Sequence, residues 1–197
     1  GWEALCFRRP PTVPPAGFQA TLRDYQETGV RWMLDLAALG AGGILADDMG
    51  LGKTVQTLAV LAARSSEGPA LVVAPKSVVP GWASEAHVFA PALHFHRLEA
   101  RSRVLSSAGP GDVVVCTYGR LRAAAKALSK VRWSTVVLDE AQAIKNPGTA
   151  VFKAAVELDA DLRLALSGTP IENRVGDLWS LLRFSVPGLL PGRKAFR

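Results

Sequence analysis

The chain has 197 residues, a length typical of one large domain, and 49% of its residues are apolar, which is enough to bury a substantial core. Charged residues make up 20%, a balance that excludes disorder of the whole chain. The net charge of +6 favours an anionic partner such as nucleic acid or a nucleotide, although a merely basic soluble surface explains it equally well.

The predicted elements begin after a proline-rich stretch. Residues 1–17 contain four prolines and predict an extended lead-in. A first helix is expected over residues 22–39, where apolar residues recur at helical spacing. Strands are then predicted at 43–46, 70–74, 93–98, 112–117, 135–140 and 162–167, and further helices at 53–64, 79–89, 120–128, 149–157 and 175–186.

Most of the strand-like runs are short, rich in β-branched residues and nearly continuous. Strands that are buried on both faces of a parallel sheet have this appearance. Because these strands alternate with helices, the sequence predicts an α/β fold: a three-layer sandwich with a mostly parallel central sheet flanked by helices.

Cysteine usage and hydropathy bear on the cellular compartment. The two cysteines, Cys6 and Cys116, are far apart and indicate neither a disulfide framework nor a metal site, which fits a reducing compartment. No uninterrupted apolar stretch reaches the ~18 residues of a membrane-spanning helix, and the first residues lack the apolar core of a signal peptide. We therefore expect a cytoplasmic protein without a membrane partner.

A short apolar run is followed by the sequence ADDMGLGKT and then by a predicted helix. This is the context of a phosphate-binding loop, although Asp47 stands where the usual pattern has its first glycine. Gly50 and Gly52 would let the backbone approach phosphates, Lys53 would add positive charge, and Thr54 would place its hydroxyl on Mg²⁺. The alternative is a glycine turn that opens an ordinary helix.

Two further segments end predicted strands in polar residues. Asp139 would hold Mg²⁺, and Glu140 would orient and deprotonate an attacking water, because ligands bind at the carboxyl ends of strands in open α/β sheets. The alternative is a pair of acids capping the next turn. The third segment, LALSGTP, places Ser167, Gly168 and Thr169 after a strand, either to hydrogen-bond the acids or the γ-phosphate or to form a plain turn.

In order and content these segments resemble the first RecA-like lobe of a superfamily 2 helicase, and in particular the Snf2 family. The matching segments are LRDYQETGVRWM (22–33, Q motif), DDMGLGKT (47–54, motif I), LVVAPKSVVPGW (71–82, motif Ia), VVVCTYG (113–119, motif Ib), DEAQAIKNP (139–147, motif II) and LALSGTPIENRVGDLWSLLRF (164–184, motif III and the next helix). The resemblance implies a RecA-like P-loop fold over residues 18–197. It also implies ATP and Mg²⁺ as cofactors, and DNA-dependent ATP hydrolysis that drives movement on duplex DNA and displaces or remodels bound proteins.

The resemblance also assigns residues to roles. The nucleotide-binding positions are Gln26, which reads adenine in the family, and Asp48, Met49, Gly50, Leu51, Gly52, Lys53 and Thr54. The catalytic positions are Lys53, Asp139, Glu140 and Gln142, the metal ligands are Thr54 and Asp139, and the coupling positions are Ser167, Gly168 and Thr169.

Asp47 departs from the general phosphate-loop pattern, and Gln142 departs from the eukaryotic members of the family. Acids at Asp47 and Asp48 are normal for motif I, though the family more often has Glu at the second. We hypothesise that Asp47 pairs with a nearby base and fixes the loop, and the alternative is plain solvation. Gln142 stands where eukaryotic members typically have His. Glutamine hydrogen-bonds but does not titrate, so a bridge to motif III is expected without a proton relay.

In the family, duplex DNA is gripped mainly through its phosphates, largely independently of sequence. The matching positions are Pro75, Lys76 and Ser77 of motif Ia and Thr117, Tyr118 and Gly119 of motif Ib, with Trp82, Lys145 and Arg174 as neighbours. For Trp82, packing is the favoured reading over base contact.

The resemblance covers one lobe only. A second RecA-like lobe carrying arginine fingers is expected to follow residue 197, so this chain alone is expected to be nearly inactive. The resemblance is to bacterial members, which implies a nucleoid-associated protein of the cytoplasm. The alternative function is a non-catalytic nucleic-acid- or protein-binding module on a relict RecA-like fold.

Overall fold

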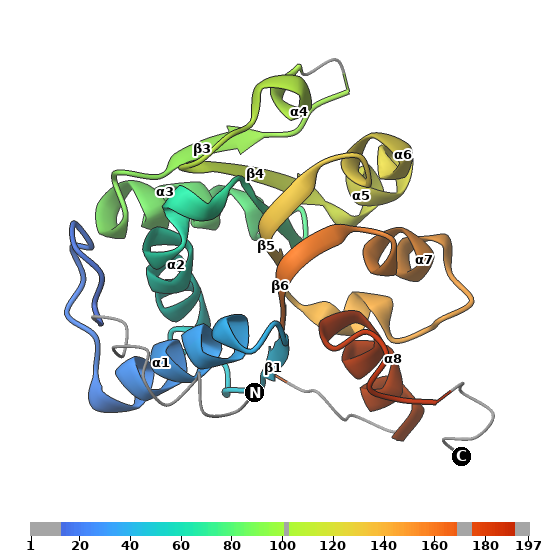
Figure 1. Cartoon of the computed structure of the whole chain (residues 1–197), viewed down its shortest axis with the longest axis horizontal. Coiled ribbons are helices and arrows are strands. Elements are labelled where there is room, and N and C mark those ends of the chain that lie inside the picture. Colours follow the sequence, from blue (N-terminus) through green and yellow to red (C-terminus); the bar gives the residue numbers. More distant parts are fainter. Residues whose placement is uncertain (1–12, 101–102, 169–174, 192–197) are drawn as a thin grey trace.

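A computed structural model describes residues 13–100, 103–168 and 175–191 and contains a six-stranded sheet with helices on both faces (Figure 1). The strands are β1 (Gly43–Leu45), β2 (Ala70–Ala74), β3 (His94–Arg97), β4 (Asp112–Thr117), β5 (Arg132–Leu138) and β6 (Asp159–Leu166). The helices are α1 (Asp24–Ala38), α2 (Lys53–Ala63), α3 (Val79–Phe89), α4 (Val104–Ser107), α5 (Tyr118–Ala123), α6 (Ala125–Leu128), α7 (Ala150–Val156) and α8 (Val175–Ser185), with short 3-10 helices η2 (Ser65–Glu67) and η3 (Ala141–Ile144).

The sequence predicted each of these six strands, and the differences lie in the bounds and in two helical regions. Strands β5 and β6 each begin three residues earlier than expected, because their polar first residues, Arg132 and Asp159, already pair across the ladder. The helix expected over 120–128 is two helices that break at Ala124. Helix α4 was not predicted. Of the expected extended lead-in, residues 13–17 form bends and a turn.

In the described part of the chain, every neighbouring pair of strands is parallel, and the order is β1-β6-β5-β2-β4-β3. The sheet predicted as mostly parallel is therefore parallel throughout these strands. In a parallel sheet all carboxyl ends lie at one edge. The strands that lead into motifs I, III and II (β1, β6 and β5) are consecutive, and those that lead into motifs Ia and Ib (β2 and β4) follow directly.

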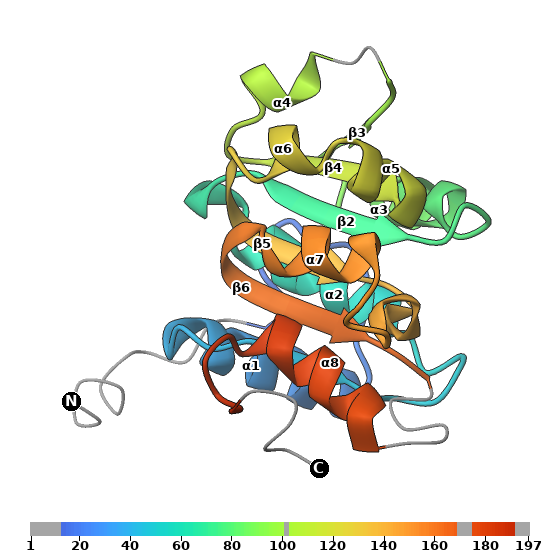
Figure 2. The ribbon, with the colours of Figure 1, turned by 90° about the vertical axis from the view of Figure 1, so that its right-hand side faces the viewer.

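Two apolar cores cover the two faces of the sheet. In β2, Ala70, Val72 and Ala74 belong to the core shared with α1, α2 and α3, whereas Leu71 and Val73 belong to the core shared with α5, α7 and α8. Figures 1 and 2 show these two groups of helices on opposite sides of the sheet. The continuous apolar runs of the sequence have this cause, since both faces of each central strand are buried.

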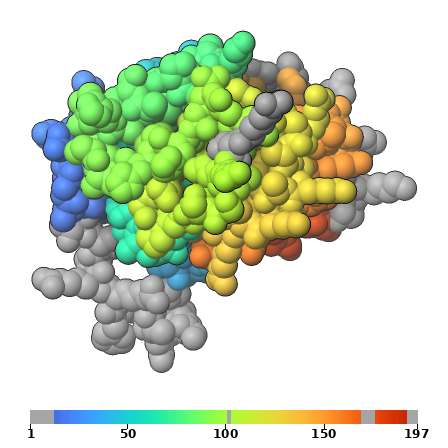
Figure 3. Space-filling view, turned by 90° about the horizontal axis from the view of Figure 1, so that it is seen from above, coloured from blue at the N-terminus to red at the C-terminus, as the bar shows by residue number. Residues whose placement is uncertain are grey.

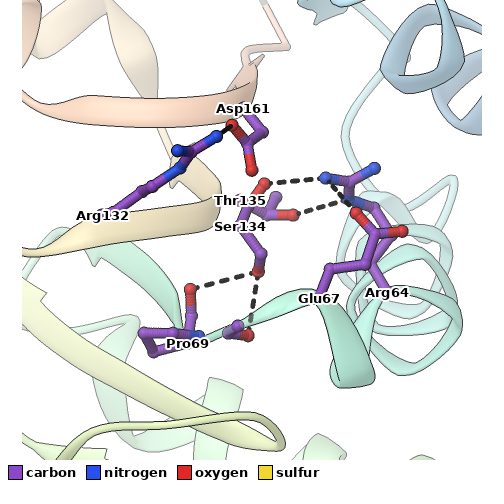
Figure 4. Close-up of polar contacts among 8 residues, drawn as sticks. Arg64, Glu67, Pro69, Arg132, Ser134, Thr135 and Asp161 are labelled. Atoms are coloured by element: carbon purple, nitrogen blue, oxygen red, sulfur yellow. Dashed lines mark hydrogen bonds and ion pairs between the residues drawn. The ribbon is translucent and has the colours of Figure 1, made fainter.

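At the amino ends of the strands, a buried arginine fastens α2 to β5 (Figure 4). Arg64, only 7% exposed, donates from Nε to Oγ1 of Thr135 (3.1 Å) and from Nη2 to the carbonyl oxygen of Ser134 (2.9 Å). It also forms an ion pair of 2.7 Å with Glu67. These contacts fix one end of α2, and the opposite end of that helix carries the predicted phosphate loop.

Candidate active site

The predicted phosphate loop connects β1 to α2. Gly52 has φ 78° and ψ 41°, a left-handed conformation that favours glycine, and a Cβ there would lie 2.5 Å from Nε2 of Gln26. Among the described residues no side chain caps α2 and no acid stands in its first turn. The amino end of α2 therefore keeps its N–H donors and positive dipole for an anion, which fits a phosphate group.

Lys53, the first residue of α2, lies over the loop. Its Nζ donates to the carbonyl oxygens of Asp47 (2.7 Å) and Asp48 (3.1 Å). A Cβ built on Gly168 would lie 3.9 Å from this Nζ and 3.2 Å from Cγ of Met49. The loop after β6 is thus brought against the phosphate loop, and the coupling role of Gly168 stays a prediction. Most loop positions assigned to nucleotide binding are exposed (Asp48, Met49, Gly50, Leu51), whereas Thr54 is half-buried in α2.

The carboxylate of Asp47 accepts a hydrogen bond of 2.9 Å from Nε2 of Gln56. Its partner is therefore an amide and not the base that we hypothesised, although the acid does tie the loop to α2. Gln56 is fully buried, and its Oε1 points at Gly29 of α1, where a Cβ would lie only 2.1 Å away. Sequence reasoning missed Gln56. Its signal was a glutamine within the mostly apolar run VQTLAVLAA.

Gln26 lies beside the same loop and is 8% exposed. Its Oε1 accepts from the backbone N–H of Arg23 (3.0 Å), and its Nε2 donates to the carbonyl oxygen of Leu51 (3.2 Å). The hydroxyl of Tyr25 donates to that same oxygen (3.2 Å). The Q motif thus contacts the phosphate loop directly, and its contact with adenine stays a prediction.

The two acids of motif II follow β5. Oδ2 of Asp139 accepts from Nε1 of Trp82 (2.8 Å), and Oδ1 accepts from the backbone N–H of Glu140 (2.9 Å). Burial raises the pKa of the Asp139 carboxyl, while these two hydrogen bonds and the nearby charge of Lys53 oppose that shift. Each carboxylate oxygen keeps a lone pair for a further ligand, which fits Mg²⁺.

Glu140 has φ 49° and ψ 55°, and it is the one non-glycine residue with positive φ in the described ranges. Such a conformation is sparsely populated for a side-chain-bearing residue and persists where the surroundings fix it. Its Oε2 accepts a hydrogen bond of 2.7 Å from Nε2 of Gln142. Glu140, which is predicted to orient water, is therefore held through its backbone N–H and through its carboxylate.

The expected bridge from motif II to motif III exists. Oγ of Ser167 donates to Oε1 of Gln142 at 3.3 Å, so Glu140, Gln142 and Ser167 form one chain of hydrogen bonds. Thr169 and Arg174 lie outside the described residues. Lys145 is exposed, and its carbonyl oxygen accepts a bond of 2.7 Å from Ser180.

The residues predicted to contact nucleic acid divide into two groups. Lys76, Ser77 and Gly119 are exposed at the carboxyl edge of the sheet. The carbonyl oxygen of Pro75 accepts from the turn that opens α3, and the hydroxyl oxygen of Thr117 caps α5 by accepting from the N–H of Arg120.

Tyr118 differs from that expectation, because its hydroxyl is directed inward. It donates to the carbonyl oxygen of Asp139 at 2.7 Å, and burial raises the pKa of the hydroxyl well above its ordinary value. Trp82 is fully buried, as the packing alternative predicted, but its N–H bond to Asp139 adds a polar role. A buried tryptophan N–H usually finds an acceptor, and the sequence could not show which one.

Within the described ranges no three His, Cys, Asp or Glu side chains gather to hold a metal ion. A Mg²⁺ that is bound together with substrate phosphates needs only one or two carboxylates, so the donor set at Asp139 and Thr54 still fits it. None of the helices in the described part of the chain is long and apolar enough to cross a membrane.

Comparisons with known proteins agree with this geometry. A family model described as the SNF2-related domain matches residues 25–197. The chain is 42% identical over 188 residues to the putative ATP-dependent helicase/translocase YwqA of Bacillus subtilis, covering 91% of this chain and 20% of that protein. It is 36% identical over 220 residues to the chromatin-remodeling ATPase INO80 of Arabidopsis thaliana, covering 100% of this chain and 15% of that protein.

A solved structure gives the same picture. The SWI2/SNF2 ATPase core of Sulfolobus solfataricus in complex with dsDNA superposes with a TM-score of 0.85 at 43% identity, covering 94% of this chain and 40% of that one. The chain thus spans about a fifth or less of these two curated relatives and two fifths of the solved core.

Proposed function

Because the chain belongs to the SNF2-related family, we propose that it is the ATP-binding lobe of a DNA-dependent ATPase that moves on duplex DNA and remodels or displaces bound proteins. The observation that carries this proposal is the meeting of three loops at one sheet edge. The loop after β1 brings Lys53, the loop after β5 brings Asp139 and Glu140, and the loop after β6 brings Ser167 and Gly168.

In this proposal each group has a task at that edge. The amino end of α2 and Lys53 hold the phosphates, and Thr54 and Asp139 hold Mg²⁺, which neutralises charge on the transferring phosphoryl group when bound. Glu140 orients the attacking water and takes its proton. The bond from Gln142 keeps the Glu140 carboxylate in place, and Ser167 connects that amide to the loop after β6.

Charge supports duplex DNA as the partner. Residues 97–132 contain eight of the 23 basic residues and two of the 17 acidic ones, so their net charge of +6 equals that of the whole chain. This segment includes motif Ib and runs from β3 through α4, β4, α5 and α6, which together form much of the surface seen from above in Figure 3. A basic surface attracts phosphates without regard to sequence.

The proposal is tested by ATP hydrolysis in the longer protein that carries this chain, with and without duplex DNA. Lys53→Ala is expected to abolish nucleotide binding, and Glu140→Gln to keep nucleotide binding but lower turnover by ~10²-fold or more. DNA binding is expected to persist in both variants. ATP hydrolysis that is unaffected by both substitutions would refute the assignment.

We also propose that this chain alone hydrolyses ATP slowly, since arginine fingers from a second lobe contribute ~10³–10⁵ in rate in related enzymes. Robust DNA-stimulated turnover by residues 1–197 alone would overturn this part. The competing function, a non-catalytic binding module, predicts DNA binding by the wild type with no detectable affinity for ATP. Isothermal titration with a non-hydrolysable ATP analogue and Mg²⁺ separates the two.

A further inference from the structure

The segment after β2 and the segment after β4 each direct one aromatic donor at the same acid. Trp82, in the first turn of α3, donates to Oδ2 of Asp139, and Tyr118, the first residue of α5, donates to the carbonyl oxygen of Asp139. We propose that Trp82 and Tyr118 are positioning residues that transmit DNA contact to Asp139 and Glu140, and so set how strongly duplex DNA accelerates ATP hydrolysis. This inference rests on the proposed function.

The sheet order places the acid between the two partners. Strand β5, which leads to Asp139, lies between β6 on the nucleotide side and β2 on the side of motifs Ia and Ib. The backbone N–H of Asp139 donates to the carbonyl oxygen of Val73 in β2 at 2.8 Å, so the pairing with β2 continues past the end of β5. A shift of the segments after β2 and β4 is therefore passed to Asp139 through direct contacts.

Each aromatic residue is rigidly joined to an exposed residue. Lys76 and Ser77 stand in the turn before α3, six and five residues ahead of Trp82, and that turn is closed by bonds from the N–H groups of Val78 and Val79 to the carbonyl oxygen of Pro75. Trp82 is fully buried, so its ring has no free space in which to absorb a shift.

On the other segment, Tyr118 stands between a capping residue and an exposed one. Thr117 caps α5 through the N–H of Arg120, and Gly119 is exposed. A shift of the turn after β4 would move the start of α5, and Tyr118 would move with it.

Tyr118 also lies close to Glu140, the residue with the left-handed conformation. Its hydroxyl oxygen lies 2.7 Å from the carbonyl oxygen of Asp139 and 3.5 Å from that of Glu140. The N–H of Glu140 is held by Oδ1 of Asp139, so the peptide that joins the two acids is fixed on both sides. The left-handed conformation of Glu140 persists only where neighbouring groups hold this peptide. The hydroxyl of Tyr118, in the segment after β4, is one of those groups.

The test uses the longer DNA-dependent protein with Tyr118→Phe and Trp82→Phe. The control is Trp133→Phe, because Trp133 is also fully buried and donates Nε1 to a carbonyl oxygen, that of Leu128, away from the acids. The first readout is the ratio of DNA-stimulated to basal ATP hydrolysis. The second is the DNA dissociation constant without nucleotide divided by that with a non-hydrolysable ATP analogue and Mg²⁺, because coupled sites change each other's binding affinity.

We expect the Tyr118 and Trp82 variants to bind DNA alone and nucleotide alone within about twofold of wild type, but to lower both ratios by about fivefold or more, at the lower end of usual coupling strengths. The Trp133 variant is expected to keep both ratios. Equal loss of basal and stimulated rates, or wild-type ratios in a folded Tyr118→Phe protein, would overturn the inference. If Trp82→Phe does not fold, Tyr118→Phe decides alone, because it removes one hydroxyl and keeps the ring. A wild type without ATP hydrolysis would instead refute the proposed function.

Discussion

Oδ2 of Asp47 lies 2.9 Å from Nε2 of Gln56, so the acid that replaces the first glycine of the general phosphate-loop pattern is bonded to the fourth residue of the helix that the loop opens. The carboxylate requires the NH₂ end of the amide, which turns Oε1 of Gln56 toward Gly29 of α1. Asp47 thus acts as an anchor that joins the loop, α2 and α1.

The first prediction concerns this anchor. Asp47→Ala removes the acceptor and is expected to weaken nucleotide binding by about tenfold, equal to ~1.4 kcal/mol and within the range for the net contribution of one intramolecular hydrogen bond. Asp47→Asn keeps an oxygen that accepts from Gln56, so its loss should be about twofold. Isothermal titration with Mg²⁺ and an ATP analogue measures both, and equal affinities for Asp47→Ala and wild type would show that the bond does not shape the loop.

A second prediction concerns the close approach of α1 to α2. In Gly29→Ala the new Cβ would lie 2.1 Å from the buried Oε1 of Gln56, so we expect a loss of ~1–3 kcal/mol in the free energy of unfolding. Gly81→Ala is the matched control, because apart from its chain neighbours and the backbone of its own helix no described atom lies within 4 Å of its Cβ; it should stabilise α3 by ~0.5–1 kcal/mol. Urea denaturation checks both, and a neutral Gly29→Ala would mean that Gln56 moves freely.

Much of the architecture was predictable because it depends on local patterns. Nearly continuous apolar runs identified most of the six strands, and the segments that follow β1, β5 and β6 pointed to Lys53, Asp139 and Ser167 at one edge of the sheet. The contacts of Trp82 and Tyr118 with Asp139 were not predictable. They join residues 57 and 21 positions apart and depend on the strand order, which hydropathy does not encode.

The sequence also does not show which way a polar side chain points when it follows the end of a strand. Tyr118 and Lys76 match motifs Ib and Ia of the family that the sequence resembles, and that resemblance placed both among the residues expected to contact nucleic acid. In the structure Lys76 is exposed, whereas Tyr118 begins α5 and its hydroxyl donates to the carbonyl oxygen of Asp139. Which way such a side chain points is decided by the cap at Thr117 and by the partner available on β5, and both are properties of the fold.

The third prediction compares two arginines at the amino ends of the strands (Figure 4). Arg64→Ala leaves the buried hydroxyl of Thr135 and the carbonyl of Ser134 without this donor and should cost ~2–3 kcal/mol of unfolding free energy. Arg132→Ala removes an exposed ion pair with Asp161 and should cost under ~0.5 kcal/mol. Thermal and urea unfolding measure both, and similar losses in the two variants would contradict the structural difference.

The fourth prediction is a pH dependence. Burial tends to raise the pKa of Asp112, but the N–H of Gly109, the hydrogen bond with His96 and the neighbouring His94 hold that pKa below its ordinary value of 3.8. A lowered folded-state pKa contributes stability that is present above the unfolded value and is lost as pH falls through the folded value. Asp112→Asn should therefore destabilise the protein at pH 7, and the difference from wild type should shrink below pH ~3.8. A stability difference between Asp112→Asn and wild type that grows as the pH falls would mean that folding raises the pKa of Asp112.

The last prediction concerns the buried thiol at the end of β4. Cys116 is 2% exposed, and burial raises its pKa to about 12 from an ordinary 9.0, with only partial opposition from the charge of Arg120. The thiolate is the reactive form, and a pKa of about 12 in place of 9.0 leaves a thiolate fraction ~10³-fold lower at pH 8. Iodoacetamide should therefore leave Cys116 largely unmodified in native protein and alkylate it readily in urea, as measured by site-resolved mass spectrometry. Equal rates in the two conditions would mean that β4 opens readily next to Tyr118, which would also deprive the proposed coupling of its rigid support.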